Sequence, residues 1–138
     1  MKNFSKDIVD HVFQVSSWRG LPQDHKNYLP KIKDNYNFIP KTIYDIGSCV
    51  LQWTYEARDI WPESEIILFD ATDIFEPLYI KENYQYNIGL LSNESNKWVD
   101  FYQNNDSFAG NSYYREKDRK STRLNSSHVS ESRMPSSA

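Results

Sequence analysis

The sequence of 138 residues contains one cysteine and no long hydrophobic run, and both absences exclude whole classes of protein. Cys49 alone can form neither an internal disulfide nor a cysteine-based metal cluster. No apolar run approaches the ~18 residues that a membrane span needs, and the first seven residues lack the apolar core of a signal peptide. We therefore expect a cytoplasmic protein without a membrane partner, and one domain rather than a large multidomain enzyme.

Basic residues are also scarce relative to acidic ones. The chain carries 16 Lys and Arg against 19 Asp and Glu, and these basic residues form no clustered stripe of the kind that phosphate binding needs. The sequence therefore argues against nucleic acid as a partner. It also contains neither a zinc-ligand spacing nor a P-loop, so we expect no metal site.

Aromatic residues are missing from the end of the chain. There are 4 Trp, 10 Tyr and 7 Phe, and the last of them is Tyr114. Residues 118–138 are rich in serine and resemble the translation of a widely used short-read sequencing adapter. We interpret them as a disordered, non-native tail and leave them out of the fold prediction. Independent amplification of the gene tests this interpretation, because the natural reading frame should then differ beyond Lys117.

The first 40 residues predict two helices that cover the rest of the domain. Ile8, Val12 and Val15 recur at helical spacing. Asp24 is placed to cap a second helix, and Pro40 closes the segment. The expected organisation is a helical cover over residues 1–40, the first half of a cofactor-binding α/β domain over residues 41–117, and the tail over residues 118–138.

From Thr42 onward, strand patterns alternate with helix patterns. Residues 42–46 and 66–69 are short apolar runs typical of buried strands. A helix capped by Ser48 should follow the first strand, and a short helix near residues 74–79 should follow the second strand. A third strand near residues 86–91 is expected to form a β-hairpin with residues 98–102. This order predicts an α/β fold: a partial doubly wound, Rossmann-like sheet with parallel strands.

Acidic residues lie at the ends of the first two predicted strands. Asp45 is near the end of the first strand, Asp70 ends the second, and a Gly47-Ser48 turn opens the helix between them. Ligands of such sheets bind at the carboxyl ends of the strands, where a carboxylate can accept hydrogen bonds from ribose hydroxyls and a helix N-terminus can hold an anionic group. The pattern favours a nucleoside cofactor. The alternative is that Asp70 merely borders solvent at a strand end.

The order of these segments resembles the FkbM-type family of S-adenosylmethionine-dependent methyltransferases. The resemblance covers about residues 40 to 116, with YDIGS at 44–48, ILFDA at 67–71, IGLLS at 88–92, FY at 101–102 and GNSYYRE at 110–116. It implies transfer of a methyl group from S-adenosyl-L-methionine to a hydroxyl of a small-molecule or glycan acceptor. The fragment would be incomplete, because the family's fourth strand with its acidic motif would fall after Lys117.

The resemblance also implies roles for individual residues. Gly47 and Ser48 would lie against the amino-acid part of the cofactor, and Asp45 would help to orient it. Asp70, with Ala71 beside it, would hold the ribose, and Gly89 would approach the adenine side. The resemblance identifies no catalytic residue.

Two residues depart from the family's pattern and leave other functions open. Leu51 stands where the turn commonly has a second glycine, and Cys49 where a small polar residue is frequent. A non-catalytic nucleotide- or sugar-binding module is therefore the alternative. Nicotinamide-dependent oxidoreduction is disfavoured, because only Gly47 remains of the three-glycine fingerprint. His11 and His25 suit a general base, but a surface or partly buried histidine on a covering helix is the favoured interpretation of both. Cys49 beside a helix start could have a lowered thiol pKa, but it has no identifiable partner, so a small buried residue is the favoured interpretation.

Overall fold

The computed structural model describes residues 4–94, 98–104 and 121–130, with side chains described as far as Tyr102. The chain divides into two compact units, Met1–Asn87 and Ile88–Ala138. The division therefore falls inside the segment 41–117 that the sequence suggests as one region. The helices of residues 1–40 belong to the same unit as the first sheet.

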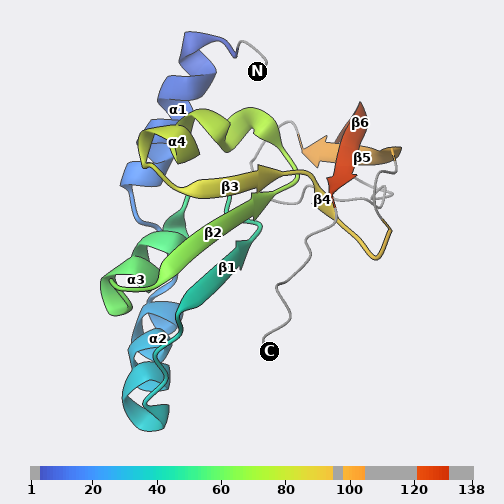
Figure 1. The fold of residues 1–138 in the computed structure, drawn as a ribbon. Coiled ribbons are helices and arrows are strands. Elements are labelled where there is room, and N and C mark those ends of the chain that lie inside the picture. The colour runs from blue at the N-terminus through green and yellow to red at the C-terminus, as the bar shows by residue number, and fades with distance from the viewer. Residues whose placement is uncertain (1–3, 95–97, 105–120, 131–138) are drawn as a thin grey trace. The chain divides into compact units, whose positions relative to one another are not determined.

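The first unit contains a parallel sheet of three strands, shown from teal to yellow-green in Figure 1. The strands are β1 (Thr42–Ile46), β2 (Glu65–Asp70) and β3 (Gln85–Ile88), in the order β1-β2-β3. Helix α3 (Gln52–Ile60) connects β1 to β2, and a single 3₁₀ turn η1 (Asp73–Phe75) with helix α4 (Glu76–Lys81) connects β2 to β3. The predicted parallel α/β sheet is thus confirmed, and it is consistent with a Rossmann-like fragment.

Strand β1 lies at the edge of this sheet. Its residues pair with β2 in register from Thr42 opposite Glu65 to Ile46 opposite Phe69. Ile46 is 65 % exposed although it ends a strand with a hydrophobic sequence. An edge strand presents backbone N–H and C=O groups to other chains, so this edge is a place where association can begin.

Both predicted N-terminal helices form and pack on the α/β unit. Helix α1 (Lys6–Ser17) packs against η1 and α4, and helix α2 (Gln23–Tyr36) packs against α3. The cap of α2 is Pro22 and not Asp24, which lies in the first helical turn, where its charge suits the positive end of the helix. The helix ends at Asn37 in the left-handed conformation, with φ of 48°.

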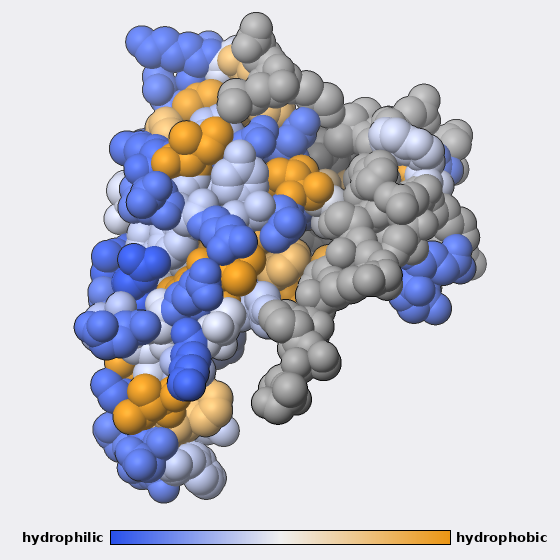
Figure 2. Space-filling view, in the orientation of Figure 1, coloured by the Kyte–Doolittle hydropathy of each residue, from blue (hydrophilic) through white to orange (hydrophobic). Residues whose placement is uncertain are grey.

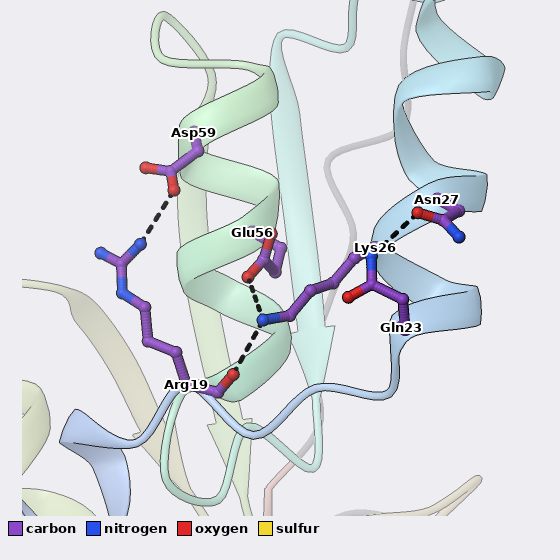
Figure 3. A network of polar contacts seen from close by, with 6 residues as sticks. All are labelled: Arg19, Gln23, Lys26, Asn27, Glu56 and Asp59. Carbon is purple, nitrogen blue, oxygen red and sulfur yellow. Dashed lines mark hydrogen bonds and ion pairs between the residues drawn. The ribbon is translucent and has the colours of Figure 1, made fainter.

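A network of polar contacts joins Arg19, in the segment between α1 and α2, and Lys26, in the first turns of α2, to helix α3 (Figure 3). Arg19 Nη1 lies 2.9 Å from Asp59 Oδ2, and Lys26 Nζ lies 3.4 Å from Glu56 Oε1 and 3.0 Å from the carbonyl oxygen of Arg19. A Cβ atom at Gly20 would lie 2.9 Å from Gln52 Nε2. Partly exposed ion pairs contribute little free energy, so the network mainly fixes where this segment crosses the start of α3.

The core of the first unit lies where the helices meet the sheet. Its largest fully buried side chains are Tyr79, Phe75, Leu51, Leu68, Leu78 and Val12. The surface of the described residues in Figure 2 is mainly hydrophilic, and its hydrophobic atoms form separate small patches. None of the helices within the described ranges is both long enough and apolar enough to cross a membrane.

The second unit corrects two expectations. Its strands β4 (Leu90–Leu91), β5 (Trp98–Asn104) and β6 (Ser121–Ser130) have the order β4-β6-β5, with β6 parallel to β4 and antiparallel to β5. The predicted hairpin between residues 86–91 and 98–102 is wrong, because β6 lies between these strands. Strand β4 has only two residues, so it could pair with only a small part of the seven-residue β5. The tail expected to be disordered contains the ten-residue β6, since β5 supplies a partner for it.

Candidate functional site

The carboxyl ends of β1 and β2 lie side by side, and the turn after β1 is bonded to the end of β2. Because β1 and β2 are neighbouring parallel strands, both end at the same edge of the sheet. The backbone N–H groups of Gly47 and Ser48 both donate to the carbonyl oxygen of Phe69, at 2.8 and 3.2 Å. The turn of residues 47–51 therefore sits over the end of β2, next to Asp70.

The 47–51 turn delays the start of the helix that follows it. Gly47, Cys49 and Leu51 all have positive φ, at 81°, 46° and 65°. Left-handed residues interrupt a right-handed helix, so α3 begins at Gln52 with Leu51 as its N-cap. The prediction of Ser48 as the helix cap is wrong: its hydroxyl donates instead to the carbonyl oxygen of Asp45, at 2.8 Å.

The turn has an open side at Gly47 and a packed side at Leu51. A Cβ atom at Gly47 would meet nothing within 4 Å, so glycine is needed there for its φ and not for space. Leu51 is fully buried. Its side chain therefore fills the core and does not occupy the space in front of Gly47, where a ligand has room to approach the backbone.

The carboxylate of Asp70 faces the turn. Oδ2 accepts a hydrogen bond from the backbone N–H of Cys49 at 2.9 Å, and Oδ1 accepts one from the N–H of Thr72 at 3.0 Å. The Tyr79 hydroxyl lies 3.5 Å from Oδ2. Asp70 is only 8 % exposed, and this burial raises its pKa despite the hydrogen bonds that lower it. The alternative that Asp70 simply borders solvent is therefore not what the structure shows.

Asp45 is a second buried carboxylate at this edge. Its Oδ2 accepts a hydrogen bond from the hydroxyl of Thr54, in the first turns of α3. Burial raises the pKa of Asp45, the Thr54 bond lowers it, and the charge of Asp70 raises it again. Within the described part of the chain, neither carboxylate forms an ion pair with a basic side chain. The site thus holds two buried acids and no cation of its own.

Cys49 is not an activated thiol. Burial, followed by the charge of Asp70, raises its pKa to about 11. Reactivity needs a lowered thiol pKa, so the less favoured interpretation, a reactive cysteine at a helix start, is wrong. The structure instead shows a small, partly buried side chain. The cause is local: the helix begins three residues later, and the nearest charge to the thiol is negative.

Two site residues were not found from the sequence. Thr54 and Tyr79 each lie nine residues after the carboxylate that they contact, and each comes from the helix that follows that carboxylate's strand. In the sequence both are indistinguishable from helix positions that face a core. The sequence contains only one indication of their role: each carries a hydroxyl nine residues after a carboxylate at a strand end.

The structure brings together most of the predicted cofactor residues, but not all. Asp45, Gly47, Ser48, Asp70 and the half-buried Ala71 lie at one sheet edge. Gly89 follows β3 and belongs to the second unit, so the site contains no described contact to it. The predicted motif at 110–116 lies outside the described residues. His11 lies on α1 and His25 on α2, and neither helix supplies a described contact to Asp45 or Asp70.

Comparison of the chain with protein-family models, with curated proteins and with solved structures finds no significant match. Among the described residues, no three His, Cys, Asp or Glu side chains are grouped so that they could hold a metal ion. The family resemblance therefore stays a prediction from sequence motifs.

Proposed function

We propose that this chain carries the cofactor-binding part of an S-adenosylmethionine-dependent methyltransferase that methylates a hydroxyl of a sugar or another small molecule. One observation carries the proposal: the buried carboxylate of Asp70 faces the glycine turn of the neighbouring parallel strand, with Cys49 N and Asp70 Oδ2 2.9 Å apart. This is the strand-end arrangement that nucleoside-binding α/β sheets use.

The charge and space at the site fit this cofactor. Two buried carboxylates without a basic partner favour a ligand that carries positive charge, and S-adenosylmethionine has a sulfonium and an ammonium group. The open side at Gly47 would admit the amino-acid part. Each Asp70 carboxylate oxygen has more than one lone pair, so Asp70 could accept a ribose hydroxyl in addition to its backbone hydrogen bonds.

The bound cofactor would supply an activated methyl group. The 47–51 turn, Asp45 and Asp70 would hold the cofactor, and its sulfonium would make the methyl group transferable to the hydroxyl oxygen of the acceptor. In such an in-line displacement the protein's main work is to align the two reactants and exclude water. For this chain we assign that work to the 47–51 turn, Asp45 and Asp70.

Binding without catalysis is the second candidate function, and one observation favours it. The titratable side chains at the site are Asp45, Cys49, Asp70 and Tyr79, and the pKa of the Cys49 thiol and of the Tyr79 hydroxyl are both raised. Neither group is available as a general base near neutral pH, and the two carboxylates already accept hydrogen bonds from Thr54, Cys49 and Thr72. A nucleotide- or sugar-binding module needs no such base.

Titration calorimetry tests the proposal. We expect the natural full-length protein to bind S-adenosylmethionine and to lose that binding in Asp70→Ala, with circular dichroism to confirm that the variant is folded. Asp59→Ala is the matched control, because it also removes an acid but lies on α3 in the contact with Arg19 (Figure 3). Binding of NAD in place of S-adenosylmethionine would refute the proposal. Binding of adenosine or a free sugar, without methyl transfer by the natural full-length protein, would support the second candidate.

A further inference from the structure

Tyr79 is the largest fully buried side chain of the first unit, and its hydroxyl reaches the candidate site. The hydroxyl donates to the carbonyl oxygen of Cys49 at 2.9 Å and has Asp70 Oδ2 as a second, more distant acceptor at 3.5 Å. The ring packs against Phe75 and Tyr86, with centroid distances of 6.4 and 5.8 Å. The core therefore fixes where this hydroxyl lies.

The β2–α4 segment thus holds Cys49 by both of its backbone polar groups. Its N–H donates to Asp70 at the end of β2, and its carbonyl accepts from Tyr79 on α4. Cys49 has a φ of 46°, a conformation that a residue other than glycine keeps only where its surroundings enforce it. These two hydrogen bonds hold Cys49 itself, while the backbone bonds of Gly47 and Ser48 to Phe69, and of Leu51 to Ser48, hold the residues on either side of it.

We propose that Tyr79 is a positioning residue, which sets the 47–51 turn against Asp70 and so fixes the shape of the site. That the shaped site serves a ligand rests on the function proposed above. The same residue links the site to the N-terminal helical layer, because α4 and η1 pack against α1. Lys81 Nζ, in the last turn of α4, lies 4.3 Å from the ring centroid of Phe13 in α1.

Cys49 is the only cysteine of the chain, so its alkylation reports on the turn without an added probe. Tyr79→Phe keeps the ring and removes the hydroxyl. Without its carbonyl contact the turn should loosen, and the pKa of Cys49 should fall from about 11 toward its usual 9.0. If the pKa falls all the way to 9.0, the fraction of thiolate at about pH 8 rises about a hundredfold. A thiolate of lower pKa is a weaker nucleophile, so the alkylation rate should rise only roughly tenfold.

The experiment measures the rate of reaction with iodoacetamide as a function of pH, for the wild type and two variants. Tyr55→Phe is the matched control: it removes a partly buried hydroxyl that bonds to Ser16 at 3.0 Å and does not touch the turn. We expect Tyr79→Phe to react up to roughly tenfold faster and Tyr55→Phe to react like the wild type. An unchanged pH profile in Tyr79→Phe would overturn the inference.

A second measurement covers the case in which Tyr79→Phe does not fold. In the wild type, the buried hydroxyl proton of Tyr79 should exchange slowly and show a nuclear Overhauser effect to Cys49. Absence of this signal also overturns the inference. Both measurements are independent of any ligand. Failure of the natural full-length protein to bind S-adenosylmethionine refutes the proposed function alone, whereas an unperturbed Cys49 refutes the positioning role alone.

Discussion

Replacing Asp45 with asparagine should make the protein more stable near neutral pH. Asp45 is 7 % exposed, burial is the main cause of its raised pKa, and it forms no ion pair within the described residues. Its hydrogen-bond partner is the hydroxyl of Thr54, which can accept a bond as well as donate one. Asparagine has nearly the same shape, so Asp45→Asn removes the charge and keeps the hydrogen bond.

The magnitude follows from the partners of the two carboxylates. A buried carboxylate without a counter-charge is costly, and the Thr54 bond offsets part of that cost, so we expect a gain of about 1–2 kcal/mol. Asp70→Asn loses a charge too, but Asp70 accepts from the fixed N–H groups of Cys49 and Thr72. One of them would face an amide NH₂ group, at a cost of about 1–3 kcal/mol, so Asp70→Asn should be the less stable of the two variants.

The pH dependence of the stability difference shows whether the charge of Asp45 causes it. The folded-state pKa of Asp45 lies above its ordinary 3.8, so the folded protein binds more protons than the unfolded chain between these two values. The stability of the wild type should therefore fall as the pH rises through this window. The advantage of Asp45→Asn should be absent below pH 3.8, grow across the window and level off above the folded-state pKa.

Urea unfolding followed by tryptophan fluorescence, at a series of pH values, measures this difference. Thr54→Val with Asp45 intact is a useful companion, because it removes the only described hydrogen bond of the carboxylate and should raise its pKa further. The reasoning is refuted if Asp45→Asn is less stable than the wild type at neutral pH. It is refuted equally if the gain is the same at acidic pH, where the carboxyl group is already neutral.

Three further perturbations address the turn, the sheet edge and the polar network. Leu51→Gly should lower stability by about 1–3 kcal/mol in urea unfolding, because the lost core packing outweighs the relief at its φ of 65°; a more stable variant would contradict the burial of Leu51. Ile46→Lys should reduce light scattering by concentrated protein at little cost in stability, and equal aggregation would show that association begins elsewhere. A double-mutant cycle on Arg19 and Asp59 should give a coupling of about 0.2–1 kcal/mol that weakens with added salt, whereas a larger, salt-independent value would contradict their exposure.

Sequence patterns predict the first unit well where the signal is local. Residues 42–46 form a short β-branched and aromatic run and residues 66–69 a continuous apolar run, both too short for a typical helix, and both are strands. The pairing of the second unit was not predictable in the same way. Whether β5 pairs with β4 or β6 depends on contacts between segments far apart in the chain, and no local pattern encodes that choice.

The candidate site likewise contains features that the sequence predicts and features that it does not. The strand-end positions of Asp45 and Asp70 follow from the order of elements, and so does their meeting at one edge of the sheet. The start of α3 does not, because Cys49 and Leu51 adopt left-handed conformations that their side chains do not favour. The role of Tyr79 depends on a hydroxyl direction that only the packed core determines.

The consecutive order β1-β2-β3 has a consequence for synthesis on the ribosome. Each strand of this sheet pairs with the next one to emerge, separated only by its connecting helix, so the sheet can grow in the direction of translation without waiting for distant segments. The hydrogen bonds of Cys49 with Asp70 and Tyr79 should form once α4 has left the exit tunnel. A nascent chain halted when Cys49 has left the tunnel but α4 has not should therefore still expose its thiol to alkylation.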